Sequence, residues 1–222
     1  MRDLPIGQVF DWEDVAIAMP DQIISSAIAE NDQFDFTVFG FGAGESISTE
    51  IVNTSKLIYV LSGQLMIEHG DRLSLLEVGE LLFLEEGVRH AIEAKTHTVF
   101  QQIHIYQKEE KYMINKIPHN ETMNLADQID VLPNKKASKA LVQRKDLTLT
   151  LFALDAGQQI AKHTATGDAL VQILEGEAGI TIDEKDFVVR AGESIVMPAE
   201  IPHALEAITA FKMLLTVVKA SE

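Results

Sequence analysis

Two histidines, His90 and His203, lie 113 residues apart, and each opens the same pentapeptide, His-Ala-x-Glu-Ala. A third histidine, His163, lies 113 residues after an acidic residue, Glu50. Imidazole titrates near neutral pH, so these side chains can transfer protons, coordinate a transition metal or line a pocket as hydrogen-bonded polar groups. Which of these they do depends on the elements that position them.

The histidines belong to a repeat that covers most of the chain. At the same spacing, and without a gap, glycine and leucine positions also match: Gly44 and Gly157, Leu61 and Leu174, Gly63 and Gly176, Gly79 and Gly192. A unit of this length is too long for a solenoid repeat and right for a small domain. We predict two tandem copies of one fold, with residues 1–110 and 122–222 as the domains and 111–121 as the linker.

The apolar residues alternate over many short segments, which predicts strands. Turn signals separate them at regular intervals, as at Gly42-Ala43-Gly44 and Asp155-Ala156-Gly157, and this spacing favours an all-β fold of antiparallel barrels or sandwiches. Short helical segments are expected just before each copy, at residues 11–15 and 124–129. The expected strands are Phe34–Phe39, Leu57–Leu61, Leu65–Glu68, Leu81–Leu84, Leu147–Leu151, Leu170–Leu174, Gly179–Ile182 and Ser194–Met197.

Composition narrows the class of protein. The chain has 222 residues, 46% of them hydrophobic, and its formal net charge is −16. A negative field of this size repels nucleic acid and anionic membranes, so neither is expected as a partner. There is no cysteine, which removes disulfides and thiolate chemistry. No apolar stretch reaches the length of a membrane span, and the start of the chain lacks the apolar core of a signal peptide, so we expect a cytoplasmic protein.

The second copy resembles a cupin domain. The segments Leu174–Ala178 and Ala191–Ala204 look like the second half of such a domain, and the whole repeat resembles a bicupin of two jelly-roll-like barrels. The positions that fall on the cupin motifs are Gly157, His163, Gly176, Gly192, Pro198 and His203. The first copy matches the motif glycines and the last histidine, His90.

The resemblance implies a divalent metal, such as iron, manganese, nickel or zinc, held by three histidines and a glutamate. In the second copy, Ala165 and Ala169 occupy two of these four positions, so His163 and His203 remain as metal or ligand contacts. Asp168 and Gln172 are close enough in sequence to join them. Two imidazoles alone rarely hold a metal, and the alternative is a pair of polar groups that line a pocket without metal.

The first copy departs further from the cupin motif. Glu50, Val52 and Lys56 occupy the first three ligand positions, which leaves Glu50 and His90 as a converging pair. On the last strand Gln102 and His104 share a face by alternation and would join the pair if that face pointed inward. We favour a solvent-facing position for both, since Ile103 on the other face is a better core residue.

Three functions remain open at this stage. The first is binding of a small molecule in the C-terminal barrel at His163 and His203. The second is a metal-dependent enzyme of the dioxygenase or sugar and keto-acid isomerase type, which the resemblance implies. The third is a structural or assembly role without ligand, in which the two barrels associate through strand edges; a monomer and a homodimer both remain open.

Overall fold

The computed structural model describes residues 1–106 and 117–219, and it is almost entirely built of antiparallel strands. The prediction of an antiparallel all-β fold with short helical leads is confirmed. Helix α1 (Trp12–Val15) and the 3-10 helix η1 (Ala126–Gln128) lie at the two predicted places. Among the described residues no helix is long and apolar enough to cross a membrane.

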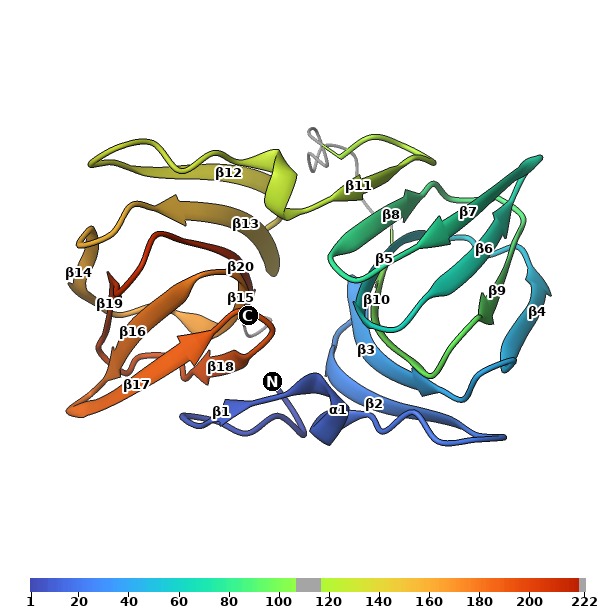
Figure 1. Cartoon of the computed structure of the whole chain (residues 1–222). Helices are drawn as coiled ribbons and strands as arrows, with labels where there is room; N and C mark the ends of the chain where they lie inside the picture. The colour runs from blue at the N-terminus through green and yellow to red at the C-terminus, as the bar shows by residue number, and fades with distance from the viewer. Residues whose placement is uncertain (107–116, 220–222) are drawn as a thin grey trace.

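The N-terminal barrel consists of two sheets that face each other (Figure 1). Within the described part of the chain, the larger sheet has the strand order β11-β8-β5-β10-β3-β2, where β11 is Thr122–Asn124, and the smaller one the order β4-β9-β6-β7. Phe41, Ile58, Ile67 and Phe100 pack between the sheets as part of its core. The strands of the first copy are β2 (Ile23–Glu30), β3 (Phe34–Phe41), β4 (Ser46–Glu50), β5 (Ser55–Ser62), β6 (Leu65–His69), β7 (Arg72–Leu76), β8 (Glu80–Leu84), β9 (His90–Ala94) and β10 (Thr98–Ile105).

The C-terminal barrel repeats this arrangement strand for strand. Over the described residues, its larger sheet has the strand order β1-β18-β15-β20-β13-β12, where β1 is Val9–Phe10, and its smaller one the order β14-β19-β16-β17. Its core includes Val171, Ile180, Met197 and Phe211. The strands of the second copy are β12 (Lys136–Gln143), β13 (Leu147–Leu154), β14 (Gln159–His163), β15 (Gly167–Glu175), β16 (Glu177–Ile182), β17 (Lys185–Arg190), β18 (Ser194–Met197), β19 (His203–Ala207) and β20 (Phe211–Lys219).

The first strand of each copy joins the sheet of the other copy. Strand β1 (Val9–Phe10) pairs with β18, and β11 (Thr122–Asn124) pairs with β8. The two strands are equivalent in the repeat, so the exchange is reciprocal. Residues 111–116 of the predicted linker 111–121 lie outside the described residues, whereas Ile117 is buried.

The large sheets of the two barrels pack against each other through a third apolar core. It joins residues such as Ile103 and Phe36 of the N-terminal barrel to Leu149 and Leu170 of the C-terminal barrel. Both faces of each large sheet are therefore covered, one by the barrel interior and the other by the second barrel. This packing decides which side chains of β5, β10 and β15 reach the barrel interiors.

Candidate functional site

A lysine is buried inside the N-terminal barrel. Lys56 alternates on β5 with Ile58 and Val60, which belong to the barrel core, so its side chain enters from the same face. Only 1% of its surface is exposed. Burial of a cation is unfavourable unless the charge is paired and hydrogen-bonded, so the partners of this ammonium define the site.

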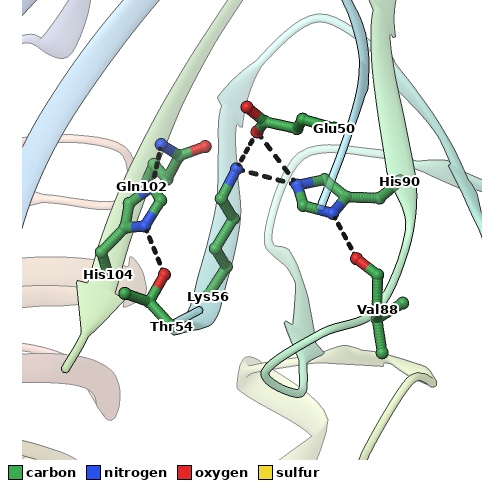
Figure 2. Close-up of polar contacts among 7 residues, drawn as sticks. All are labelled: Glu50, Thr54, Lys56, Val88, His90, Gln102 and His104. Carbon is green, nitrogen blue, oxygen red and sulfur yellow. Dashed lines mark hydrogen bonds and ion pairs between the residues drawn. The ribbon is translucent and has the colours of Figure 1, made fainter. Parts of the chain in front are cut away.

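Glu50 and His90 are the partners of Lys56 (Figure 2). The two residues face each other across strands β4 and β9, and the ammonium lies beside the point where their side chains meet, in contact with both. Lys56 donates a hydrogen bond to the Glu50 carboxylate, and its Nζ is 2.8 Å from His90 Nε2. Glu50 Oε1 is also 3.2 Å from His90 Nε2. The three side chains form one compact polar cluster, here called the lysine cluster.

The tautomer of His90 follows from its second contact. His90 Nδ1 is 2.8 Å from the carbonyl oxygen of Val88, which can only accept, so Nδ1 carries the proton and donates. Nε2 is then the acceptor that faces the Lys56 ammonium. Burial lowers the pKa of His90 and the charge of Lys56 lowers it further, against the opposing effects of Val88 and Glu50, so the neutral ring is favoured.

The Glu50 carboxylate lies on the solvent side of the lysine cluster. Its side chain is 36% exposed, whereas those of Lys56 and His90 are almost completely enclosed. Burial alone would raise the pKa of Glu50, but the hydrogen bond from Lys56 and the nearby positive charges outweigh it and lower the pKa. Glu50 therefore stays ionised beside the ammonium and is the member of the cluster that solvent reaches.

Gln102 and His104 also point into this barrel. Gln102 is buried and His104 is half-buried. The expectation that both face solvent was therefore wrong for Gln102. Gln102 Nε2 donates to His104 Nε2 at 2.8 Å, and His104 Nδ1 lies 2.8 Å from Thr54 Oγ1. Figure 2 shows this chain of contacts beside Lys56. The expectation failed because Ile103 on the other face packs against the second barrel, so the strand has two buried faces.

The C-terminal barrel brings His163 and His203 together at the equivalent place. They are register partners across β14 and β19, and their ring centroids are 4.5 Å apart in an edge-to-face arrangement. Each Nδ1 is 2.9 Å from the backbone oxygen two residues earlier, which leaves Nε2 as the acceptor in the neutral ring. His203 is buried and His163 exposed. Burial, with a smaller effect of the charge of His163, lowers the pKa of His203.

Asp168 and Gln172 do not join this histidine pair. Ala169 and Val171 face the barrel interior, so by alternation Asp168 and Gln172 point toward the other barrel. Asp168 pairs with the amino group of Met1 and accepts a hydrogen bond from the Ala199 N–H at 3.0 Å. The expectation rested on closeness in sequence alone, and it is wrong because β15 turns both side chains away from the histidine pair.

Neither barrel offers the donor set that a metal would need. In the N-terminal barrel the Lys56 ammonium contacts both Glu50 and His90, and its charge opposes a divalent cation there. In the C-terminal barrel two imidazoles are present, whereas metal sites generally use three or more protein ligands. The described residues contain no group of three or more His, Cys, Asp or Glu placed to hold a metal ion.

Sequence reasoning counted Lys56 only as a lost ligand and missed its role. A signal was available: Lys56 stands in the run Lys-Leu-Ile-Tyr-Val and alternates with two core residues. An inward lysine in a strand of this kind needs a counter-ion, and Glu50, already named as an inward residue, supplies it.

Comparisons with known proteins agree with this architecture. Residues 150–219 match the family model described as Cupin domain. A search of curated proteins found no match. Among solved structures, a Cupin 2 conserved barrel domain protein from Leptotrichia buccalis is 27% identical to this chain, with a TM-score of 0.85. The match covers 97% of this chain and 98% of the Leptotrichia chain.

Two more distant structures share the fold. A putative glyoxylate induced protein from Pseudomonas aeruginosa is 19% identical with a TM-score of 0.66, and the match covers 96% of this chain and 90% of its own. A salicylate 1,2-dioxygenase from Pseudaminobacter salicylatoxidans is 12% identical with a TM-score of 0.62, over 87% of this chain and 76% of its own. The family model thus matches a part of the C-terminal barrel, and the solved structures share the fold of the chain.

Proposed function

We propose that this chain is a bicupin that binds a small carboxylate-bearing molecule in its N-terminal barrel without a resident metal ion. The observation that carries the proposal is the position of Lys56. Its ammonium contacts Glu50 and His90, which stand at two of the positions where the cupin motif places metal ligands. In this proposal the Lys56 ammonium takes the place of the metal as the positively charged group inside the barrel.

A carboxylate is the ligand that this arrangement favours. The Lys56 ammonium is enclosed, and its carboxylate partner Glu50 is the solvent-exposed member of the cluster. A small anion can therefore exchange with Glu50 as the counter-ion of Lys56 while His90 and Lys56 keep their positions. Hydrogen bonds between an ammonium and a carboxylate are charge-assisted and stronger than neutral ones.

The histidine pair of the C-terminal barrel is a second proposed contact site, for a weakly polar molecule. The open Nε2 atoms of His163 and His203 support it, together with the absence of a charged partner at the equivalent of Lys56, which is Ala169. Catalysis by a bound metal is the alternative function. It would require ligands that this chain replaces by Lys56 in one barrel and by alanine in the other.

Calorimetric titration with salicylate tests the carboxylate proposal. We chose this probe because it combines a carboxylate with a small ring, and because one of the structural neighbours is a salicylate 1,2-dioxygenase. The wild-type protein should bind it, Lys56→Met should weaken binding at least tenfold, and His163→Ala should leave it unchanged. Binding that survives in Lys56→Met and disappears in His163→Ala would place the ligand in the other barrel and contradict the proposal.

A further inference from the structure

The seam between the two barrels contains a cavity of about 280 Å³. Both large sheets contribute to its wall, and the lining residues Leu61 and Leu174 are equivalent in the repeat. Two other lining residues, Trp12 and Tyr59, belong to the apolar core between the barrels. The cavity therefore adjoins that core, and no residue of the lysine cluster or of the histidine pair lines it.

One side of this cavity carries a buried hydroxyl without a hydrogen-bond partner. Tyr59 is 7% exposed, and its hydroxyl makes no hydrogen bond within the part of the chain that the structure describes. The completely enclosed side-chain atoms that lack a partner there belong to Gln101, Gln102 and Gln172, so the Tyr59 oxygen is not sealed off. Burial raises the pKa of Tyr59, so the hydroxyl stays uncharged. Polar groups buried to this extent normally have a partner, and the open space beside this one is the cavity.

The charged groups that line the cavity are both carboxylates, Asp127 and Glu175. Asp127 is exposed, and no cation among the described residues is paired with it. Glu175 is paired with Lys212 at 3.1 Å, and the same ammonium donates to the backbone oxygen of Ala126 at 2.9 Å. Lys212 itself does not line the cavity, so a molecule inside meets carboxylates and no ammonium. The formal net charge of −16 acts in the same direction and favours a cation.

An aromatic ring forms a further part of the wall. Trp12 is buried, and its indole N–H donates to Ser194 Oγ at 2.9 Å. The hydrogen-bonding group of this side chain is therefore used, and its ring remains as an apolar surface of the cavity. Aromatic rings attract cations as well as apolar groups. Rings, a free hydroxyl oxygen and carboxylates together favour a ligand with a cationic head and an apolar body.

We propose that this cavity binds a small primary amine whose ammonium group is joined to an aromatic or aliphatic body. The ammonium donates to the Tyr59 hydroxyl oxygen and faces the Asp127 carboxylate, and the body lies against Trp12. An ammonium has donors only, whereas a carboxylate accepts only and a hydroxyl can accept. The volume is at the lower end for ligand pockets, so the molecule has to be small. This site does not depend on the lysine cluster.

Fluorescence of Trp12 gives a direct test, because this residue lines the cavity and is the only tryptophan of the chain. Benzylamine is the probe, and benzyl alcohol is the matched compound of similar shape without the charge. The expected result is a saturable change in emission with benzylamine and binding of benzyl alcohol that is weaker by about tenfold or more. Failure of benzylamine to saturate, or equal binding of the two compounds, would overturn the proposal.

Removal of the hydroxyl locates the amine within the cavity. Tyr59→Phe keeps the ring and should weaken benzylamine binding about tenfold, because a hydrogen bond to a charged group is lost. Binding of benzyl alcohol should change less, since its hydrogen bond is neutral. Undiminished benzylamine binding in Tyr59→Phe would contradict the assignment.

Removal of the carboxylate separates a specific site from general attraction by the net charge. Asp127→Asn should weaken benzylamine binding about fivefold, since an exposed carboxylate contributes modestly. Asp14→Asn is the matched control, because Asp14 is the equivalent residue in the repeat and does not line the cavity. It removes the same charge from the chain and should leave binding unchanged. Equal losses in the two variants would show that the net charge alone attracts the amine and would overturn the site.

Discussion

The two barrels share their strand order but differ in what fills their interiors. The repeat pairs Lys56, Gln102 and His104 of the N-terminal barrel with Ala169, Leu215 and Val217 of the C-terminal barrel, in that order. One interior therefore contains a charged, hydrogen-bonded cluster, and the other contains apolar side chains with one histidine pair at the edge. The two interiors show that one scaffold accommodates either a paired charge or an uncharged core at the same position.

Transfer of the lysine to the other barrel should have the largest effect. Ala169→Lys would place an ammonium at the equivalent of Lys56, where His163 replaces the carboxylate of Glu50. An unpaired buried charge should lower the free energy of unfolding by about 3–5 kcal/mol, measured by urea denaturation. Ala169→Met, of similar length without charge, should lower it by about 1–3 kcal/mol. Equal losses in the free energy of unfolding for the two variants would show that side-chain volume, and not charge, decides what the C-terminal barrel accepts at this position.

Removal of the counter-ion should have the next largest effect. Glu50→Ala leaves Lys56 enclosed without its carboxylate, and because Glu50 is 36% exposed we expect a loss of about 2 kcal/mol rather than the full value for a buried pair. The equivalent change in the other barrel, His163→Ala, removes an exposed side chain and should stay within about 0.5 kcal/mol. Urea denaturation of both variants checks this. Similar losses in the two barrels would contradict the assigned role of Glu50.

Acidification should produce a smaller and graded difference between the barrels. Burial lowers the pKa values of His69, His90 and His104 in the N-terminal barrel and of His203 in the C-terminal one. As pH falls below the ordinary histidine pKa of 6.5, the unfolded chain binds protons before the folded chain does. The stabilisation that these histidines contribute above pH 6.5 is therefore lost as pH falls toward their lowered pKa values in the folded protein. Hydrogen exchange at about pH 7.5 and 5.5 should show protection falling more in the N-terminal barrel.

The opposite ranking, with the C-terminal barrel losing more protection in acid, would contradict this account of the histidines. His90→Gln is a useful second measurement. Lys56 and Glu50 are the charged groups closest to His90, and their charges oppose each other in setting its pKa. The variant removes one titrating group from the N-terminal barrel. It should reduce the pH dependence of hydrogen-exchange protection in that barrel without changing it in the C-terminal barrel.

Much of the architecture was predictable because local signals and the repeat agree. Matched glycines at turns, such as Gly63 and Gly176, have positive φ angles of +78° in both copies, and an added side chain would meet backbone there. The strands expected from alternation were found. The reciprocal exchange of β1 and β11 was not predictable, since a two-residue or three-residue strand carries no alternation signal of its own.

The candidate site was predictable only in part. Glu50, His90, His163 and His203 were found from the repeat and the cupin resemblance. The directions of Gln102, Asp168 and Gln172 were missed because the sequence does not show that a second barrel covers the outer face of each large sheet. That cover turns apolar residues on both faces into core residues, and it sends Asp168 and Gln172 to the interface.

Manganese binding tests the central claim, that Lys56 takes the place of a metal, most directly. Free Mn²⁺ is followed by electron paramagnetic resonance in the presence of wild-type protein, Lys56→Glu, and Lys56→Glu combined with His90→Ala. The claim predicts no binding by the wild type in this barrel, binding of about one ion per chain when Lys56→Glu restores the carboxylate of the motif, and loss in the double variant. Binding of Mn²⁺ by the wild-type protein that His90→Ala abolishes would contradict the claim.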